Sequence, residues 1–264
     1  MNFDDALKHH LPRVWFQFQF AKYKHFGRGE PELKLVRHLI ERGSTAIDIG
    51  LSIGMFANEM ARHAGRVIAF EANPAVADFA RGLLPRNVEV INAALSAQAG
   101  CTTLRIPRTT RGRAITELGT IAPENLLPGI DTISVEVATQ RLDDQNTANC
   151  SFIKIDVEGH EEAVLDGAAR TIATQRPAVL VEINESSNAG GLARAIARFA
   201  AQSYGGFYLT RGRLRPIAEF DRARDQDDSL LSYGRGRLPP GREYINNFIF
   251  VPEEKGARIL AHLS

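Results

Sequence analysis

Residues 46–54 read AIDIGLSIG, and two incompatible motifs overlap in these nine letters. Residues 50–54, GLSIG, form a G-x-S-x-G, the pattern of the nucleophile elbow in α/β-hydrolases. Residues 48–54 also form D-x-G-x-x-x-G, a glycine-rich turn whose backbone can approach a nucleotide closely. The surrounding sequence has to decide whether Ser52 attacks a carbonyl or whether its loop holds a cofactor.

The composition is that of an ordinary globular protein and disfavours several classes. The 264 residues are 44% hydrophobic and 24% charged, with a formal net charge of +1. We expect no nucleic-acid partner, because the chain has neither a basic excess nor a nucleic-acid-binding motif. No apolar run reaches the ~18 residues of a transmembrane segment, and the N-terminus does not read as a secretory signal. With only two cysteines, Cys101 and Cys150, the chain is predicted to be cytoplasmic.

Strand-like and helix-like segments alternate, which predicts an α/β fold with a mostly parallel sheet. The predicted strands are 45–49, 66–70, 87–91, 151–156, 178–183, 207–210 and 244–251, and the predicted helices are about 31–42, 55–63, 74–84, 161–174 and 192–202. We interpret 96–150 as an inserted hairpin or flap, because it contains strand-like stretches and no clear long helix. Residues 211–243, rich in Arg, Asp, Gly and Pro, are predicted to form a mobile loop. A helical and aromatic segment, 1–43, precedes the main domain, 44–264.

The place of the glycine-rich turn in the chain favours a cofactor. A hydrolase elbow follows several strands, whereas only 44 residues precede the first predicted strand here. Asp48 ends that strand, Gly50 and Gly54 bracket the turn, and Glu71 ends the next strand, 17 residues after the last glycine. A carboxylate at about this spacing can accept both hydroxyl protons of a ribose. Position 52 is Ser, so the G-x-G-x-x-G of dinucleotide folds is not met. A tight turn without a ligand is the alternative.

The chain also resembles the FkbM-type methyltransferases. The matching segments are AIDIGLSIG (46–54), VIAFEANP (67–74), NAALS (92–96), TQRLDD (139–144), FIKIDVEGHEEAVLDGA (152–168) and AVLVEIN (178–184). The resemblance implies a Rossmann-like class I methyltransferase fold. Its seven-stranded sheet has the order 3-2-1-4-5-7-6, with strand 7 antiparallel, helices on both faces and the inserted β-hairpin after strand 3. It also implies S-adenosyl-L-methionine as cofactor and O-methylation of a hydroxyl on a sugar-containing or secondary-metabolite acceptor.

The predicted cofactor site lies at the carboxyl ends of the strands, where ligands of such sheets bind. The residues at these ends are Asp48, Glu71, Asn92, Asp156 and Glu182. Glu71 is expected to take the ribose hydroxyls, and Gly50 and Ser52 to line the methionine portion. Asp48 is expected to order the loop between them.

Three further segments bear on the cofactor. The small residues Ala93 and Ala94 would let the adenine lie flat against the backbone. Residues 30–33, EPEL, look like the segment that opens the family's domain, whose acid approaches the methionine end of the cofactor. The family usually carries Ala-Asn where this chain has Leu51-Ser52, so the reach of an amide is lost here. A catalytically silent, cofactor-binding protein is therefore an alternative, as is the Ser52 hydrolase.

Residues 154–160, KIDVEGH, are predicted to carry the reaction. Alternation places Lys154, Asp156 and Glu158 on one face while the strand lasts, and buried charges of this kind need partners. Asp156 then faces the sulfonium, and either Asp156 or His160 accepts the hydroxyl proton. The sequence does not rank these two. A Lys154–Asp156 pair that only satisfies itself is the structural alternative.

The remaining polar clusters are ambiguous. Asp156 and Glu182, on neighbouring strand ends, could hold Mg²⁺, but they have no spacing signature, so no metal site is predicted and Glu182 is assigned to the acceptor. Arg clusters at 108–113, 211–215 and 235–242 are either solvated loop charge or contacts for an anionic small-molecule or glycan acceptor. The aromatic run at 15–26 fits a lid, a homo-oligomer contact, a membrane-surface anchor or core packing.

Overall fold

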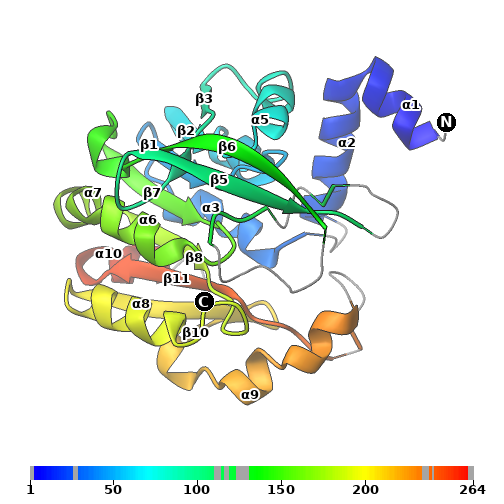
Figure 1. Cartoon of the computed structure of the whole chain (residues 1–264). Helices are drawn as coiled ribbons and strands as arrows, with labels where there is room; N and C mark the ends of the chain where they lie inside the picture. Colours follow the sequence, from blue (N-terminus) through cyan, green and yellow to red (C-terminus); the bar gives the residue numbers. More distant parts are fainter. Residues whose placement is uncertain are drawn as a thin grey trace.

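A single large sheet organises the chain in the computed structural model, which describes residues 3–25, 29–109, 114–115, 119–122, 131–233, 238–239 and 241–260. Its strand order is β10-β9-β11-β8-β7-β1-β2-β3 (Figure 1). The strands are β1 Thr45–Ile49, β2 Arg66–Phe70, β3 Val88–Ile91, β7 Cys150–Ile155, β8 Ala178–Glu182, β9 Tyr204–Thr210, β10 Arg213–Pro216 and β11 Asn247–Pro252. No described helix is both long and apolar enough to span a bilayer.

The sheet topology confirms the predicted fold class. β3, β2, β1, β7 and β8 are parallel, and β11 runs antiparallel between β8 and β9. The order β3-β2-β1-β7-β8-β11-β9 is therefore the predicted 3-2-1-4-5-7-6, with β11 as the antiparallel strand 7. The prediction of seven strands is corrected by an eighth, β10, which forms an antiparallel hairpin with β9 at the sheet edge.

Helices cover both faces of the sheet. They are α1 Phe3–His10, α2 Pro12–His25, η1 Pro31–Lys34, α3 Val36–Leu39, α4 Met55–Met60, α5 Pro74–Arg81, η4 Leu142–Asp144, α6 Glu161–Gly167, α7 Ala169–Gln175, α8 Gly191–Ala200, η5 Ile217–Glu219, α9 Arg222–Asp225, η6 Asp228–Tyr233 and α10 Glu253–Leu260. Residues from α2 to α5 and from α10 share one buried apolar cluster, and residues from α6, α7 and α8 share a second. Because side chains alternate along a strand, each face of the sheet feeds one cluster.

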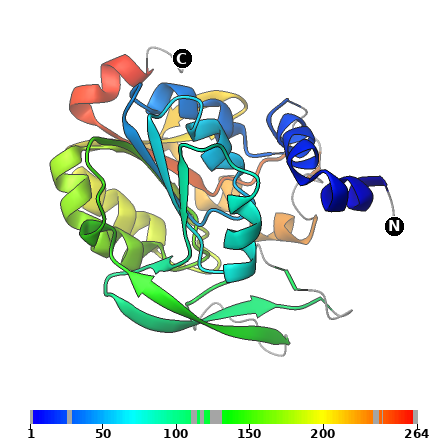
Figure 2. The ribbon, with the colours of Figure 1, turned by 90° about the horizontal axis from the view of Figure 1, so that it is seen from above.

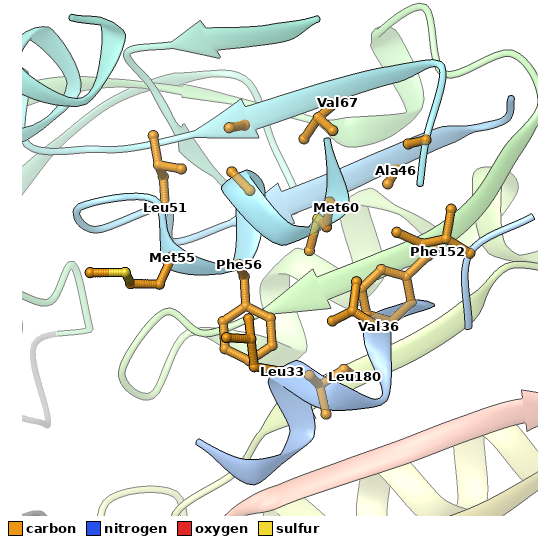
Figure 3. Packing of buried hydrophobic residues seen from close by; sticks show 14 of the residues in the cluster. Leu33, Val36, Ala46, Leu51, Met55, Phe56, Met60, Val67, Phe152 and Leu180 are labelled. Carbon is orange, nitrogen blue, oxygen red and sulfur yellow. The ribbon is translucent and has the colours of Figure 1, made fainter. Parts of the chain in front are cut away.

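The first apolar cluster fixes the N-terminal segment against the sheet. Figure 3 shows Phe56 and Met60 of α4 beside Val36, Val67 and Phe152, which come from three other elements. Trp15, Phe16 and Phe20 of α2 belong to the same cluster, so this part of the aromatic run packs on the core.

An inserted hairpin stands apart from the main sheet. β4 Ala94–Leu95, β5 Gly100–Pro107 and β6 Thr132–Gln140 form a second, three-stranded sheet of order β4-β6-β5. Figure 2 shows β5 and β6 as a ribbon outside the helical layers. Its own apolar contacts include Leu104, Ile106 and Val137. The predicted hairpin after the third strand is thus present.

Two further sequence predictions need correction. The helix predicted over 161–174 is interrupted at Ala168, because the Asp143 carboxylate accepts hydrogen bonds from the backbone N–H groups of Arg170 and Thr171 at 3.0 and 2.8 Å. This remote side chain caps α7 as an N-cap residue would.

The second correction concerns the loop predicted over 211–243. Its described part contains β10, η5, α9 and η6. Gln226, which is buried, anchors this region by donating to the carbonyls of Ile183 and Ile245, both at 2.9 Å. Residues 234–237 and 240 lie outside the described residues, as do residues 110–113 of the first Arg cluster.

Candidate active site

A cavity of about 260 Å³ opens at the carboxyl ends of β1, β2 and β7. This is the edge at which parallel α/β sheets bind ligands. The predicted site residues that line it are Asp48, Gly50, Ser52, Glu71, Ala93, Ala94, Asp156, Glu158 and His160. Gly54 and Glu182 do not line it. The fold therefore brings most of the predicted residues to one place, including the two candidate proton acceptors.

Gly50 lies where the loop after β1 meets the loop after β7. Its φ is 85°, and a Cβ on this residue would lie 1.7 Å from the backbone oxygen of Asp156. Only glycine tolerates both the dihedral angle and the contact. Gly54 has a different role: it is the N-cap residue of α4, with a φ of 87°, and it packs against Leu84. Gly50 therefore lets two backbone segments form one wall of the cavity.

The Glu71 carboxylate is fixed by backbone donors on two sides. The Ser52 N–H and the Asn73 N–H each donate to one of its oxygens at 2.8 Å. Burial raises the pKa of Glu71, while these two hydrogen bonds lower it in part. A carboxylate oxygen can accept more than one hydrogen bond, so both oxygens can also meet a ligand in the cavity. Glu71 thus joins the loops after β1 and β2 and presents a rigid pair of acceptors.

Lys154 provides a buried positive charge beside the cavity. Its Nζ donates to Asp156 Oδ2 at 2.9 Å and lies 4.8 Å from the centre of the Phe56 ring. Burial lowers the Lys154 pKa, but the carboxylates of Asp156, Asp48 and Glu30 more than reverse this, so its pKa is raised. The ammonium therefore stays charged, and the Lys154–Asp156 pair that the sequence offered as the structural alternative is present.

Asp48 is the most deeply buried acid of the site. Its side chain is 1% exposed, and neither oxygen has a well-formed hydrogen bond to the described residues. Burial raises its pKa to about 7, and Lys154 and the Ala57 backbone N–H offset only part of this effect. Asp48 therefore titrates near neutrality, whereas an exposed aspartate is ionised well below it.

Three carboxylates converge beside the cavity. Glu30, Asp156 and Glu182 each place an oxygen within 4.8 Å of the others. Glu30 accepts hydrogen bonds from the Tyr23 hydroxyl at 2.8 Å and from Asn247 Nδ2 at 3.1 Å. The structure thus adds Glu30 to the pair considered from the sequence. Because protein donors already contact these groups, the cluster alone does not identify a metal site.

The loop after β7 is held in an uncommon conformation. Glu158 has a φ of 49° and Gly159 a φ of 94°. Glu161, 3% exposed, accepts a hydrogen bond from the Gly159 N–H at 2.6 Å and another from Asn188 at 3.0 Å. His160 then lies against Ser96, with 2.9 Å between Nε2 and the hydroxyl oxygen. Glu161 was not predicted from the sequence, although it directly follows the KIDVEGH segment.

The inserted hairpin and the segment beside it complete the cavity. Leu104 of β5 lines it together with Gly119 and Ile121. Thr120, between the latter two, donates from its hydroxyl to the backbone oxygen of Glu158 at 2.8 Å. The insertion is therefore bonded directly to the loop that carries the candidate catalytic residues.

In the described structure, the surroundings of Ser52 are not those of a catalytic nucleophile. Its N–H binds Glu71, while the histidine in the same cavity, His160, is engaged with Ser96. A nucleophilic serine needs a base within hydrogen-bond reach. The geometry therefore disfavours the hydrolase hypothesis.

Comparison with known families identifies the family of the chain. Residues 48–213 match the family described as the Methyltransferase FkbM domain. The chain belongs to this family. The matched range includes Asp48, Glu71, Asp156 and His160, which line the cavity, whereas Glu30, which also lines it, precedes the matched range. No protein of curated function matches the sequence significantly.

Several solved structures are similar. A methyltransferase FkbM from Methylobacillus flagellatus KT is 14% identical, with a TM-score of 0.49, and the alignment covers 94% of this chain and 60% of that one. The chain thus spans less than two thirds of that protein. An O-methyltransferase from Bacillus cereus is 16% identical, with a TM-score of 0.47 and 94% of both chains covered. A precorrin-6y C5,15-methyltransferase from Geobacter metallireducens GS-15 is 15% identical, with a TM-score of 0.45, covering 88% of this chain and 93% of that one.

Proposed function

We propose that the protein transfers a methyl group from S-adenosyl-L-methionine to a hydroxyl oxygen of a small-molecule or glycan acceptor. Membership of the FkbM methyltransferase family supports methyl transfer. The observation that carries the donor assignment is Glu71, which two backbone N–H groups hold at the edge of the cavity. Such a preorganised carboxylate suits the two vicinal hydroxyls of a ribose.

The charge of the cavity favours a cationic donor. Five acids, Glu30, Asp48, Glu71, Asp156 and Glu158, line its described wall together with one ammonium group, that of Lys154. S-adenosylmethionine has a positive sulfonium in addition to its amino and carboxylate groups, so an acidic surface attracts it. The product, S-adenosylhomocysteine, has lost the sulfonium charge. The same surface therefore holds the product less strongly than the donor.

The acceptor loses a proton as the methyl group moves to its oxygen, and His160 is the proton acceptor that we favour. One oxygen of Asp156 is already occupied by the Lys154 ammonium. His160 instead faces Ser96: with its hydrogen on Nε2, the neutral ring donates to the Ser96 hydroxyl oxygen and can take the acceptor's proton on Nδ1. Ser96 can therefore keep the ring in place before and after proton transfer. Asp156 then lies toward the positive sulfonium.

The acceptor contacts the part of the cavity formed by the inserted hairpin and the loop after β7. Leu104 and Ile121 give this part an apolar surface, and Glu158 and His160 give it polar groups. Acids outnumber cations on the described wall of the cavity, which favours a neutral acceptor over an anionic one. We assign Glu182, which has a carboxylate oxygen within 4.8 Å of Asp156 and Glu30, to a hydroxyl-rich acceptor that extends beyond the cavity.

Calorimetry with S-adenosylmethionine and S-adenosylhomocysteine tests the donor assignment. The wild-type protein should bind both, and Glu71→Ala should weaken binding by about 10–100-fold, because two charge-assisted hydrogen bonds are lost. Glu89→Ala is the matched control, since Glu89 is an exposed acid on β3 that pairs with Arg66. Absence of binding to the wild type would refute the proposal. Binding without turnover on any hydroxylated acceptor would instead favour the silent, cofactor-binding alternative.

A further inference from the structure

The outer face of α2 exposes a row of large apolar side chains. Leu11, Val14 and Phe18 are 54%, 55% and 48% exposed. Their spacing places them on one side of a helix, and the hydrogen bond from the Trp15 N–H to the Leu11 oxygen continues the helical pattern back to Leu11. They are the large hydrophobic residues most exposed among those that the structure describes. The inner face of α2, with Phe16 and Phe20, is buried.

This apolar row lies in a basic segment. Residues 6–25 contain four Lys or Arg, three His and no Asp or Glu. Lys22 extends over the Phe18 ring, with 3.9 Å from Nζ to the ring centre, so a cation and an aromatic ring share the exposed face. Lys24 is paired with Glu59, the Lys8 ammonium lies over the Trp15 and Phe79 rings, and Arg13 donates to the Gly82 carbonyl, so Lys22 is the cation shown directly beside the row. Both ribbon views show α1 and α2 projecting from one side of the molecule (Figures 1 and 2).

This combination of exposed apolar and basic side chains indicates the kind of surface to which α2 can bind. A helix face with Phe and Leu beside Lys and Arg is the composition that binds in the interface of an anionic bilayer. A second copy of the chain fits less well, because two such faces would bring like charges together. Three side chains also cover far less than the roughly 800 Å² per partner of a standard protein interface.

We propose that the exposed face of α2, formed by Leu11, Val14, Phe18 and Lys22, docks on membrane surfaces that contain anionic phospholipid. Leu11, Val14 and Phe18 enter the headgroup region, and the basic side chains contact lipid phosphates. The opposite face of the same helix supplies Tyr23 to the candidate active site. Docking would therefore hold the cavity close to the bilayer. The proposal does not depend on methyl transfer, since it rests on the surface of α2 alone.

Vesicle sedimentation with the full chain tests the proposal. The protein should bind vesicles of mixed phosphatidylcholine and phosphatidylserine at least about tenfold better than vesicles of phosphatidylcholine alone. High salt should weaken this binding, because the Debye length falls from about 10 Å at 0.1 M to about 3 Å at 1 M. Val14→Ser/Phe18→Ser should lower binding about tenfold or more, because little apolar surface is left to insert. Gln17→Ser, on the same exposed turn, is the matched control and should bind as the wild type does.

Two further measurements do not depend on the double variant folding. Lys22→Glu should lower binding severalfold, whereas Arg213→Glu, on the distant edge strand β10, should not. Trp15, the single tryptophan, lies on α2, so phospholipids with brominated acyl chains should quench its fluorescence if the helix inserts.

The proposal is overturned if anionic vesicles are not preferred or if the brominated lipids do not quench Trp15. Equal binding by the folded double variant would also overturn it. Light scattering provides the last test. A dimer that Val14→Ser/Phe18→Ser dissociates would assign the face to a second copy of the chain.

Discussion

The two walls of the cavity are held together by different kinds of contact. In the donor wall, formed by Gly50, Ser52 and Glu71, the decisive contacts involve the backbone: Gly50 lies against the Asp156 carbonyl, and two N–H groups hold Glu71. In the acceptor wall, formed by residues 119–121 and 158–160, side-chain hydroxyls make the links, from Thr120 to Glu158 and from Ser96 to His160. Backbone contacts allow few substitutions, whereas side-chain contacts can change without rebuilding the sheet. We therefore expect a constant donor site and an adaptable acceptor site.

The largest expected effect lies in the acceptor wall, at His160. His160→Ala should lower turnover by about 10²–10⁴-fold, because general-base catalysis contributes about this much, and should leave the affinity for S-adenosylhomocysteine within about twofold. Release of S-adenosylhomocysteine across a panel of hydroxylated acceptors measures the first quantity, and calorimetry the second. His63→Ala, outside the cavity and shortly after the end of α4, is the control. If turnover is unchanged in His160→Ala but lost in Asp156→Ala, then Asp156 is the proton acceptor.

The next prediction compares the cost of a blocked backbone contact with the cost of an unfavourable backbone dihedral angle. Gly50→Ala introduces a Cβ that would lie 1.7 Å from the Asp156 oxygen, whereas Gly43→Ala, at a similar φ of 79°, meets nothing within 4 Å. We expect Gly43→Ala to cost about 1–2 kcal/mol of unfolding free energy from dihedral strain. Gly50→Ala should cost about 3 kcal/mol or more and abolish donor binding. Denaturant titration measures both, and equal losses would show that the contact between the two loops does not matter.

Asp48, below the donor wall, should make stability depend on pH. Its pKa rises from the ordinary 3.8 to about 7 in the folded protein. Between these values the folded state keeps a proton that the unfolded state releases, so this contribution to stability is lost as pH rises through the window. Asp48→Asn should therefore gain roughly 1–3 kcal/mol relative to wild type between pH 4 and 8. Asp78→Asn, exposed on α5, is the control. Parallel pH profiles for wild type and Asp48→Asn would refute this assignment.

The smallest effect concerns the link between the insertion and the acceptor wall. Thr120→Val keeps the shape of the side chain but removes the hydroxyl that donates to the Glu158 oxygen and accepts from the Ala122 N–H. Loss of one such hydrogen bond costs about 1 kcal/mol, so the KM for the acceptor should rise about fivefold while donor affinity stays unchanged. Thr102→Val, on β5 outside the cavity, should change neither. A loss of donor affinity in Thr120→Val would show that the two walls are not independent.

The contrast between the two walls also explains which parts of the site could be predicted from the sequence. The donor wall was predictable because Gly50 and Glu71 follow two successive strands, and parallel strands end at one edge of a sheet. Tyr23 and Ile121 were not predicted, because they reach the cavity from a distant helix and from the insertion, where no short motif fixes their position. Tyr23 did lie in the aromatic run that the sequence set apart, but neither spacing nor composition indicated that its hydroxyl meets Glu30.

The fold shows similar limits of local patterns. The split between α6 and α7 depends on Asp143, which is distant in sequence and caps the second helix. β10 was missed because its residues 213–216, RLRP, are mainly charged and exposed and lack the apolar pattern of a strand. Antiparallel pairing with β9 creates the strand there. The helix split thus depends on a residue 27 positions before Arg170, and β10 depends on pairing with the strand that directly precedes it.

The most direct test of the account is a crystal structure of the protein with S-adenosylhomocysteine at saturating concentration. We predict that the ribose hydroxyls lie within hydrogen-bond distance of the Glu71 carboxylate. The sulfur should lie beside the wall that the Gly50 and Asp156 backbones form. A nucleoside bound elsewhere, or a cavity that stays empty under these conditions, would contradict the central claim.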